Sequence, residues 1–342
     1  MTDFMYHALA SNSHVIAEKI MQKHGKTFAL AAKLLTPASR SDATELYAFA
    51  RTVDDWIDLQ ATNHSAQAKI VALQKAFSLH DTNTFGHIQT ILKNYAIPNE
   101  VMHAFLQAQL HDEDCQHIAT QQALIDYAYG VAGSIGRLMR PILGAPMAAE
   151  MCATSLGIAM QLTNIARDVV EDAGRMRIYV PATFFSLDAN IAIQNIALKN
   201  LAPIKIYPQN IKHPTKQEAE IIFAAIKKLL LLADQYYAFA QSGYQTIPLR
   251  NRLSIAAAGA MYCAIGKKII ARGCQKYWRG RVSINGIHKA AIGLTAIIAT
   301  LFNSIFKSEK KFHNAIFNHH AANNNATIIA SIEYAIAYYQ HK

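Results

Sequence analysis

The sequence predicts an all-helical protein with a large apolar interior. Apolar residues recur at helical spacing along most of the 342 residues, and no stretch shows the strict alternation that is typical of strands. Ala, Leu, Ile, Lys and Gln are frequent while Gly and Pro are sparse over long stretches, which favours helix over sheet. Hydrophobic residues make up 52% of the chain and charged residues 16%, so we expect a sizeable core rather than disorder.

Turn residues and capping signals divide the periodic stretches into helices. Pro37 and Pro98 mark loops, and Thr215 with Glu218 forms a capping-box signature that opens a helix. Three prolines between residues 198 and 214 mark another loop, and the His/Asn-rich stretch 313–325 is a polar connector. In chain order we expect helices at residues 13–35, 40–60, 66–79, 84–95, 99–110, 121–143, 148–172, 215–239, 250–272, 288–306 and 326–339.

The formal net charge of +10 points to an anionic partner. Nucleic acid, anionic lipid and a polyphosphate substrate all fit this charge. Lys and Arg are scattered, however, and no dense basic run is interleaved with aromatic residues, so we expect no nucleic-acid-binding surface. The four cysteines lie far apart without a C-x-x-C pair, which argues against a zinc site or a disulfide framework and fits the cytoplasm.

One apolar segment raises the question of membrane contact. Residues 290–306 carry no charge, and Lys289 and Lys307 flank them. The segment is short for a spanning helix and contains Thr, Asn and Ser residues. We expect a packed terminal helix, with a peripheral anchor at the inner face of the membrane as the alternative.

An acidic helix face is expected in residues 46–58. Chemistry-bearing residues recur there at spacings of four, three and four, which places them on one face: Tyr47, Arg51, Asp54 and Asp58. Two carboxylates one turn apart repel each other unless a cation lies between them.

A second acidic face is expected in residues 161–172. Oxygen-bearing side chains recur there at spacings of three, four and four: Gln161, Asn164, Asp168 and Asp172. Either helix alone could equally turn its acidic side to water. Together, two oxygen-rich faces suit hard Mg²⁺, which prefers carboxylates and phosphate oxygens.

Basic residues near both faces are candidates for binding a diphosphate: Lys26, Arg51, Arg167 and Arg177. Arg offers bidentate phosphate contacts and Lys a mobile point charge. Any one of them could instead form a surface salt bridge. With Mg²⁺, such cations would stabilise a departing diphosphate, which is the chemistry of allylic ionisation.

These motifs resemble those of the squalene/phytoene synthase family. The run Arg51–Asp58, with its D-D-x-x-D, is similar to the family's first aspartate-rich motif, and Gln161–Pro181 is similar to the second. Val131–Gly136 looks like the family's Val-Ala-Gly-x-Val-Gly helix. The resemblance spans about residues 19–289 and implies a single isoprenoid-synthase helical bundle with a central active-site cavity.

The resemblance also implies an activity. The family condenses two prenyl diphosphates, geranylgeranyl or farnesyl, head to head through a cyclopropylcarbinyl diphosphate intermediate. A phytoene synthase-like prenyltransferase is expected; the alternatives are a squalene, dehydrosqualene or presqualene diphosphate synthase, or a non-catalytic assembly factor. We expect the synthase domain at residues 1–290 and a C-terminal helical extension at 291–342, which either packs or contacts a membrane. The use of NADPH and the oligomeric state stay open.

Carried over by position, the family's roles fall on particular residues. Two or three Mg²⁺ ions would be held by Asp54, Asp58, Asn164, Asp168 and Asp172, and these aspartates with Tyr47 and Tyr179 form the expected catalytic set. Substrate would contact Lys26, Phe28, Arg51, Gln161, Asn164, Arg167, Arg177 and Tyr262. The aromatic side chains either stabilise cations through their π-faces or serve as ordinary core residues.

Glycines and one departure from the family pattern complete the expectations. Gly130, Gly133 and Gly136 either leave room for a prenyl chain or let two helices approach, and the resemblance favours the first. His-Gly-Lys-Thr, with Gly25 at its second position, stands where the family usually has His-Ser-Lys-Ser. This puts the diphosphate contacts near Lys26 in question.

Overall fold

The computed structural model describes residues 14–59, 64–81, 85–112, 117–185, 205–306 and 319–340. The side chains at 58–59, 64–65, 112, 305–306 and 319–322 lie outside this description, although their backbone is helical. Within the described ranges the chain is helical, with turns and one isolated bridge between His117 and Ile178. The all-α prediction is confirmed.

The first part of the chain forms a layer of helices around the first acidic face. Its elements are α2 (His14–His24), α3 (Lys26–Ala32), α4 (Pro37–Leu59), α5 (His64–Ser78), α6 (Gly86–Asn94) and α7 (Asn99–Asp112). Large apolar side chains such as Trp56 and Phe49 of α4 are fully buried, and they pack among Phe77, Phe85 and Phe105.

The central part carries the second acidic face on a long helix. In chain order its elements are α8 (Gln121–Ala128), the π-helical segment η1 (Tyr129–Gly133), α9 (Ser134–Ile142), the 3₁₀ turn η2 (Met147–Ala149), the long helix α10 (Glu150–Gly174) and the 3₁₀ turn η3 (Ala182–Phe184). The last part comprises α12 (Pro208–Lys212), α13 (Lys216–Ser242), η5 (Tyr244–Thr246), α14 (Leu249–Arg272), α15 (Cys274–Tyr277), α16 (Gly286–Phe306) and α18 (His319–Gln340).

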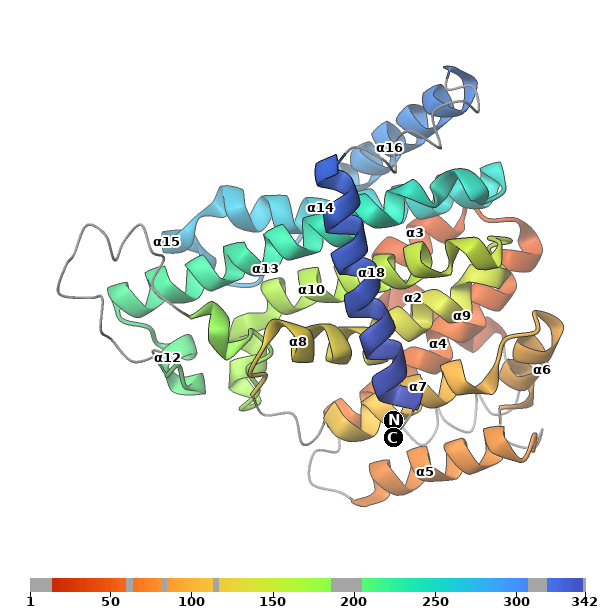
Figure 1. The fold of residues 1–342 in the computed structure, drawn as a ribbon, viewed down its shortest axis with the longest axis horizontal. Helices are drawn as coiled ribbons and strands as arrows, with labels where there is room; N and C mark the ends of the chain where they lie inside the picture. Colours follow the sequence, from red (N-terminus) through yellow and green to blue (C-terminus); the bar gives the residue numbers. More distant parts are fainter. Residues whose placement is uncertain are drawn as a thin grey trace.

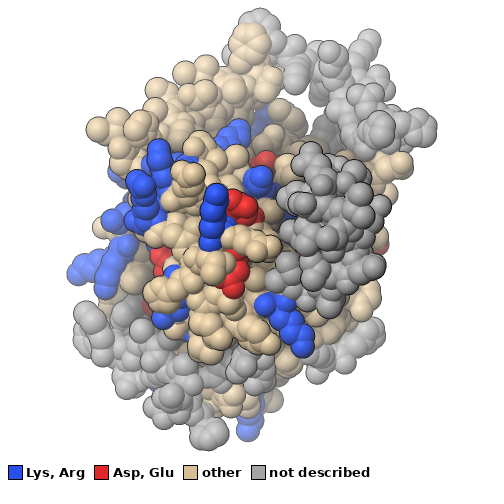
Figure 2. All heavy atoms as spheres, turned by 90° about the vertical axis from the view of Figure 1, so that its left-hand side faces the viewer, with Lys and Arg blue, Asp and Glu red and all other residues tan. Residues whose placement is uncertain are grey.

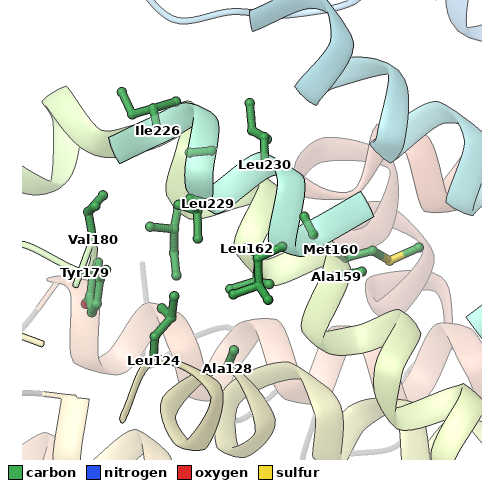
Figure 3. Close-up of a cluster of buried hydrophobic side chains, with 14 of the residues drawn as sticks. Leu124, Ala128, Ala159, Met160, Leu162, Tyr179, Val180, Ile226, Leu229 and Leu230 are labelled. Atoms are coloured by element: carbon green, nitrogen blue, oxygen red, sulfur yellow. The ribbon is translucent and has the colours of Figure 1, made fainter. Parts of the chain in front are cut away.

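Helix α10 is the centre of the bundle. It packs against α13, α9, η1 and α14, and in Figure 1 α18 crosses this central layer while α16 projects away from it. The apolar core between α8, α10, α13 and residues 179–180 is shown in Figure 3, where Leu124, Leu162 and Leu229 lie close together. All three are fully buried, and each stabilises the fold by roughly 1.5–3 kcal/mol.

Glycines bring η1 and α9 into backbone contact with α10. A Cβ on Gly136 would lie 2.2 Å from the carbonyl oxygen of Ala153, and one on Gly157 would lie 2.2 Å from that of Ala132. A Cβ on Gly133 would meet the side chains of α10 at 3.2 Å, and one on Gly130 would collide with Ala108 and Tyr339. The preferred expectation, room for a prenyl chain, is therefore wrong at these positions, because protein atoms already fill the space.

The helices differ from the predicted ranges in a few places. Gly25 (φ −112°, ψ 46°) divides the expected helix 13–35 into α2 and α3. The expected loop 198–214 contains α12, whose first residue is Pro208, a residue pre-organised for this position. Residues 319–325 of the expected connector belong to α18, where Ile328 and Ile332 are buried against the bundle and outweigh the weak helix propensity of the preceding asparagines.

Candidate active site

The first acidic face is organised around Arg51 on α4. Its Nη1 donates to Asp54 Oδ2 at 2.9 Å, and its Nη2 donates to Asp55 Oδ1. Burial alone would lower the pKa of Arg51, but the two carboxylates raise it above its ordinary value, so the guanidinium stays charged. Its Nε is buried and has no hydrogen-bond partner within the described ranges. The helical backbone carries Asp58 one turn further on, but its side chain lies outside the described residues.

The second acidic face is held by two guanidiniums on Asp168. Arg167 donates through Nε and Nη2 at 2.7 and 2.5 Å, and Arg281 donates through the same pair of atoms at 2.7 and 2.8 Å. Burial would raise the pKa of Asp168, but these charge-assisted hydrogen bonds outweigh it and hold the pKa below its ordinary value. Asp168 is therefore an anion locked between two cations, one from α10 and one from the segment after α15.

Gln161 and Asn164 lie on the same helix, two turns and one turn before Asp168, respectively. Asn164 Nδ2 donates to Gln161 Oε1 at 3.3 Å. Asn164 Oδ1 is buried and, in the part of the chain that the structure describes, accepts no hydrogen bond. An orphaned buried acceptor is costly unless a ligand completes it, so this oxygen suits a hard cation.

Three further predicted residues meet at the C-terminal end of α10. Asp172, Arg177 and Tyr179 surround a narrow crevice together with apolar side chains that include Ile165 and Val169 of α10 and Ile211 of α12. Arg177 Nη1 donates to the hydroxyl of Tyr179 at 3.3 Å. The ring of Tyr179 stacks on Tyr127 of α8, with the ring centroids 4.8 Å apart and the planes 18° apart. Tyr179 is buried, and its ring packs in the apolar core of the bundle.

A row of aromatic rings connects the two acidic faces. Phe28 of α3 lies 5.5 Å from Tyr47 of α4 and 5.2 Å from Tyr262 of α14, measured between ring centroids. Burial raises the pKa of Tyr47 well above its usual range, and the neighbouring carboxylates Asp54 and Asp55 act in the same direction. Burial likewise raises the pKa of Tyr262, which feels the charges of the second acidic face. Both phenols are therefore neutral at pH 7.

Gly25 makes room for this row. A Cβ at this position would lie 2.6 Å from both the Cζ and the hydroxyl oxygen of Tyr47. Glycine in place of the family's usual serine therefore leaves the space that the ring of Tyr47 occupies. Lys26, the residue after Gly25, is exposed and is the first residue of α3.

Lys26, Arg167 and Lys289 form a group of like charges. Burial lowers the pKa of Lys289, and the charges of Lys26 and Arg167 lower it further. Helix α16, which carries Lys289, contacts α3, which begins at Lys26. Asp168 already pairs with Arg167, and the added positive charge of Lys26 and Lys289 suits the several negative charges of a diphosphate. Figure 2 shows Lys and Arg side chains around a smaller group of Asp and Glu side chains on the end of the bundle where α12 and α15 lie.

Sequence reasoning missed Arg281 and underrated Lys289. Arg281 stands in an irregular segment, Trp278–Val282, 113 residues from its partner Asp168, and no periodic pattern points to it. Lys289 was noted only as a flank of the apolar segment 290–306. The net positive charge of the chain indicated that cations bind a polyphosphate, but it did not indicate that Arg281 and Lys289 are among them.

The predicted carboxylates do not converge into a metal centre among the described side chains, where no three His, Cys, Asp or Glu residues are close enough to hold a metal ion. Asp54 and Asp168 instead pair with arginines. The donor types still fit Mg²⁺, because they are carboxylate and amide oxygens, and the oxygen of Asn164 is left over for it.

Comparison with known proteins gives a consistent result. A family model described as squalene/phytoene synthase matches residues 21–288. The chain is 31% identical to the 15-cis-phytoene synthase of Enterobacter agglomerans over 291 residues, which is 81% of this chain and 92% of that protein. It is 30% identical to the 15-cis-phytoene synthase of a Paracoccus species, over 80% of this chain and 86% of that protein.

A solved structure shares the fold. The crystal structure of a dehydrosqualene synthase in complex with a ligand superposes with a TM-score of 0.69 at 22% identity, and covers 86% of this chain and 98% of that chain. At this level of identity the similarity shows the helical architecture.

Proposed function

The chain belongs to the squalene/phytoene synthase family, and on this premise we propose that it is a prenyltransferase that condenses two prenyl diphosphates head to head. The observation that carries the proposal is the meeting of anion-binding cations with a row of aromatic rings. Arg167, Arg281 and Lys289 gather at one end of the row formed by Tyr262, Phe28 and Tyr47. A molecule with a charged diphosphate head and an unsaturated apolar chain matches both features.

The cations would bind and orient the diphosphates. Arg51 can donate its unpartnered Nε while its other nitrogens keep Asp54 and Asp55 in place. Lys26 and Lys289 add mobile point charges that follow the diphosphate as it departs. Arg177 is placed beside Tyr179 at the end of α10, where it can contact the second diphosphate. Gln161 and Tyr262 contribute polar hydrogen-bond donors between these charges.

We propose Mg²⁺ as the cofactor, in two or three ions. The residues that would hold it are Asp54, Asp58, Asn164, Asp168 and Asp172, and the orphaned oxygen of Asn164 supports this assignment. Mg²⁺ bound to these oxygens and to the diphosphate would supply the positive charge that makes the diphosphate a good leaving group.

The aromatic row would stabilise the allylic cation that diphosphate departure leaves. The rings of Phe28, Tyr47 and Tyr262 are neighbours along this row, and the neutral phenols are weaker nucleophiles toward a cation than phenolates would be. Attack by the double bond of the second substrate gives a new carbocation, and loss of a proton from it closes the cyclopropane ring of a cyclopropylcarbinyl diphosphate. This intermediate loses its own diphosphate and rearranges. Loss of a proton then ends the reaction at a phytoene-type product.

We propose phytoene, made from geranylgeranyl diphosphate, as the product, because the relatives at 30–31% identity are 15-cis-phytoene synthases. Squalene or dehydrosqualene formation from farnesyl diphosphate is the second candidate, and only squalene needs hydride from NADPH. We place the synthase domain at residues 1–290 and the extension at 291–342, in a cytoplasmic enzyme that touches the membrane peripherally. The boundary falls within the first turns of α16.

The proposal is tested by incubating the purified chain with Mg²⁺ and either farnesyl or geranylgeranyl diphosphate, with and without NADPH, and identifying products by mass spectrometry. We expect a coupled hydrocarbon that is independent of NADPH. Asp54→Ala and Asp168→Ala should abolish turnover while circular dichroism still shows the helical fold. Glu333→Ala, which removes an exposed carboxylate on α18, is the matched control and should keep full turnover. Wild-type turnover in either active-site variant would refute the assigned roles.

A further inference from the structure

Helix α16 carries an exposed apolar face. Of the described helices, α14 and α16 are long and apolar enough to cross a membrane by length and composition, but they differ in burial. Half of the apolar stretch of α14 is buried, as in the core helix of a bundle, whereas 6% of that of α16 is buried. The largest exposed side chains of α16 are spaced seven, four and four residues apart, so they form one stripe: Ile287 (82%), Leu294 (57%), Ile298 (58%) and Phe302 (59%).

The opposite face of α16 packs on α14. A Cβ on Gly293 would lie 3.8 Å from Ala257, and Arg252 Nη1 donates to Ser304 Oγ at 3.0 Å. The protein-facing side of α16 also carries Ile292 and Ile297, which pack against the core. The outward stripe is therefore a second apolar face, at the position where a helix folded against water would carry polar side chains. In Figure 1 α16 extends beyond the body of the bundle, in agreement with the exposure of the stripe.

The hydroxyl groups of α16 are compatible with an apolar environment, because each already donates a hydrogen bond within the helix. Thr295 donates to the carbonyl oxygen of Ala291 at 3.0 Å, and Thr300 donates to that of Ala296 at 2.7 Å. Ser304 donates to the carbonyl oxygen of Thr300 at 2.8 Å. Each of these groups is satisfied within the helix itself, so contact with hydrocarbon would leave none of them unpaired.

The charge around α16 selects an anionic surface. From residue 235 to residue 308 the sequence contains no Asp or Glu. Its charged side chains are all basic: Arg250, Arg252, Lys267, Lys268, Arg272, Lys276, Arg279, Arg281, Lys289 and Lys307. Some of them lie at the two ends of α16, since Lys268 donates to the carbonyl oxygen of Ser283 at 2.7 Å and Arg252 contacts Ser304. An apolar stripe between basic ends is the pattern of a helix that lies in the interface of an anionic bilayer.

The base of α16 adjoins the candidate active site. Helix α16 contacts α3, whose first residue is Lys26. The charges of Lys26 and Arg167 also act on Lys289, which lies in the first turn of α16. We infer that α16 docks the chain on an anionic lipid bilayer through the stripe Ile287–Leu294–Ile298–Phe302, and that this docking holds the diphosphate-binding cations at the membrane surface. The second half of the inference rests on the proposed function: a prenyl diphosphate dissolved in the bilayer then reaches Lys289 and Lys26 without its chain crossing water.

Vesicle co-sedimentation of the full chain tests the docking. The variant carries Leu294→Gln, Ile298→Gln and Phe302→Gln, and the control carries Val71→Gln, Met147→Gln and Leu231→Gln, which are exposed to a similar degree (53%, 62% and 65%) on other parts of the surface. We expect the wild type and the control to bind vesicles that contain phosphatidylglycerol, and the variant to bind them at least ~100-fold more weakly, because three large apolar side chains no longer enter the lipid. Equal binding of variant and wild type would overturn the inference.

Two further measurements exclude other occupants of the stripe. With vesicles present, the fluorescence of the tryptophan introduced by Ile298→Trp should shift to shorter wavelength and should be quenched by brominated lipid. The fluorescence of the tryptophan introduced by Leu231→Trp should show neither change. A wild type that is dimeric without lipid, and a glutamine variant that is monomeric, would show that a second copy covers the stripe and would overturn the inference. Wild-type binding to neutral phosphatidylcholine vesicles at the same strength would overturn the charge argument.

Activity assays keep the docking separate from the proposed function. The glutamine variant should turn over detergent-dispersed geranylgeranyl diphosphate at the wild-type rate, and should lose most of its turnover when the substrate is embedded in anionic vesicles. Equal loss under both conditions would overturn the link between docking and substrate supply. A chain that docks through α16 but forms no coupled product under any condition would refute the proposed function and leave the docking intact.

Discussion

The close approach of η1 to α10 makes Gly157 a sensitive position. A methyl group there would lie 2.2 Å from the carbonyl oxygen of Ala132, 2.7 Å from its carbonyl carbon and 3.1 Å from the Cα of Gly133. These are backbone atoms, so no side-chain rotation can relieve the clash, and the two segments must separate by about 1 Å to reach van der Waals contact. Gly157→Ala therefore tests whether this packing fixes the helix that carries the second acidic face.

The expected loss of stability is about 2 kcal/mol. Overpacking of a tightly packed interior costs about 1–3 kcal/mol, and a clash with backbone belongs at the upper end of that range. Replacing a glycine inside a helix with alanine returns about 1 kcal/mol through helix propensity. Since Gln161 and Asn164 follow Gly157 by one and two turns, we also expect turnover to fall.

Gly174→Ala is the matched control on the same helix. Nothing lies within 4 Å of a Cβ at this position, and the residue is exposed. The change should leave stability unaltered or raise it by about 0.4–1 kcal/mol, because it removes conformational freedom from the unfolded chain. Urea unfolding followed by far-ultraviolet circular dichroism measures both variants. A Gly157→Ala protein as stable as the wild type, or an equal loss in Gly174→Ala, would refute the packing argument.

Three further predictions concern the site. In Arg281→Gln, the pKa of Asp168 should rise toward its usual value, since one of the two guanidiniums that depress it is gone. Because its folded-state pKa is depressed, Asp168 stabilises the fold above its unfolded-state pKa of about 3.9, and this stabilisation is lost as the pH falls. The variant should therefore differ more in stability from the wild type at pH 7 than at pH 3, and equal differences would contradict the pairing. Gly25→Ala should displace the ring of Tyr47 and lower kcat without unfolding the chain, whereas an unchanged kcat would separate Tyr47 from turnover. Chelation of divalent cations should abolish turnover and readdition of Mg²⁺ should restore it, while product formation in chelator would exclude the metal from the reaction.

Local signals predicted the helices well because each helix carries its own evidence in sequence. Thr215 and Glu218 form the expected capping box, with Thr215 N–H donating to the carboxylate at 2.7 Å and Glu218 N–H donating to the hydroxyl at 3.3 Å. The two acidic faces were visible for the same reason, since their residues are three or four positions apart. The break at Gly25 was missed because it depends on Tyr47, which lies on another helix.

Contacts between distant parts of the chain could not be predicted from spacing. The pairing of Arg281 with Asp168 joins residues 113 positions apart, and the contact of Phe28 with Tyr262 joins α3 to α14. The role of Gly136 depends on how closely α9 approaches α10, and a sequence pattern does not report that distance. Residue spacing was thus enough to propose the site residues, which stay a prediction, but it did not identify the partners that set their charge.

The central claim is that two prenyl diphosphates are joined to each other. It is tested most directly by supplying the purified chain and Mg²⁺ with a mixture of unlabelled and fully deuterated geranylgeranyl diphosphate and weighing the hydrocarbon product. The account predicts a product that contains one labelled and one unlabelled chain, alongside the two uniform species, and no such product from Asp168→Ala. Prenyl alcohol as the sole product, or a hydrocarbon with a single prenyl chain, would contradict it.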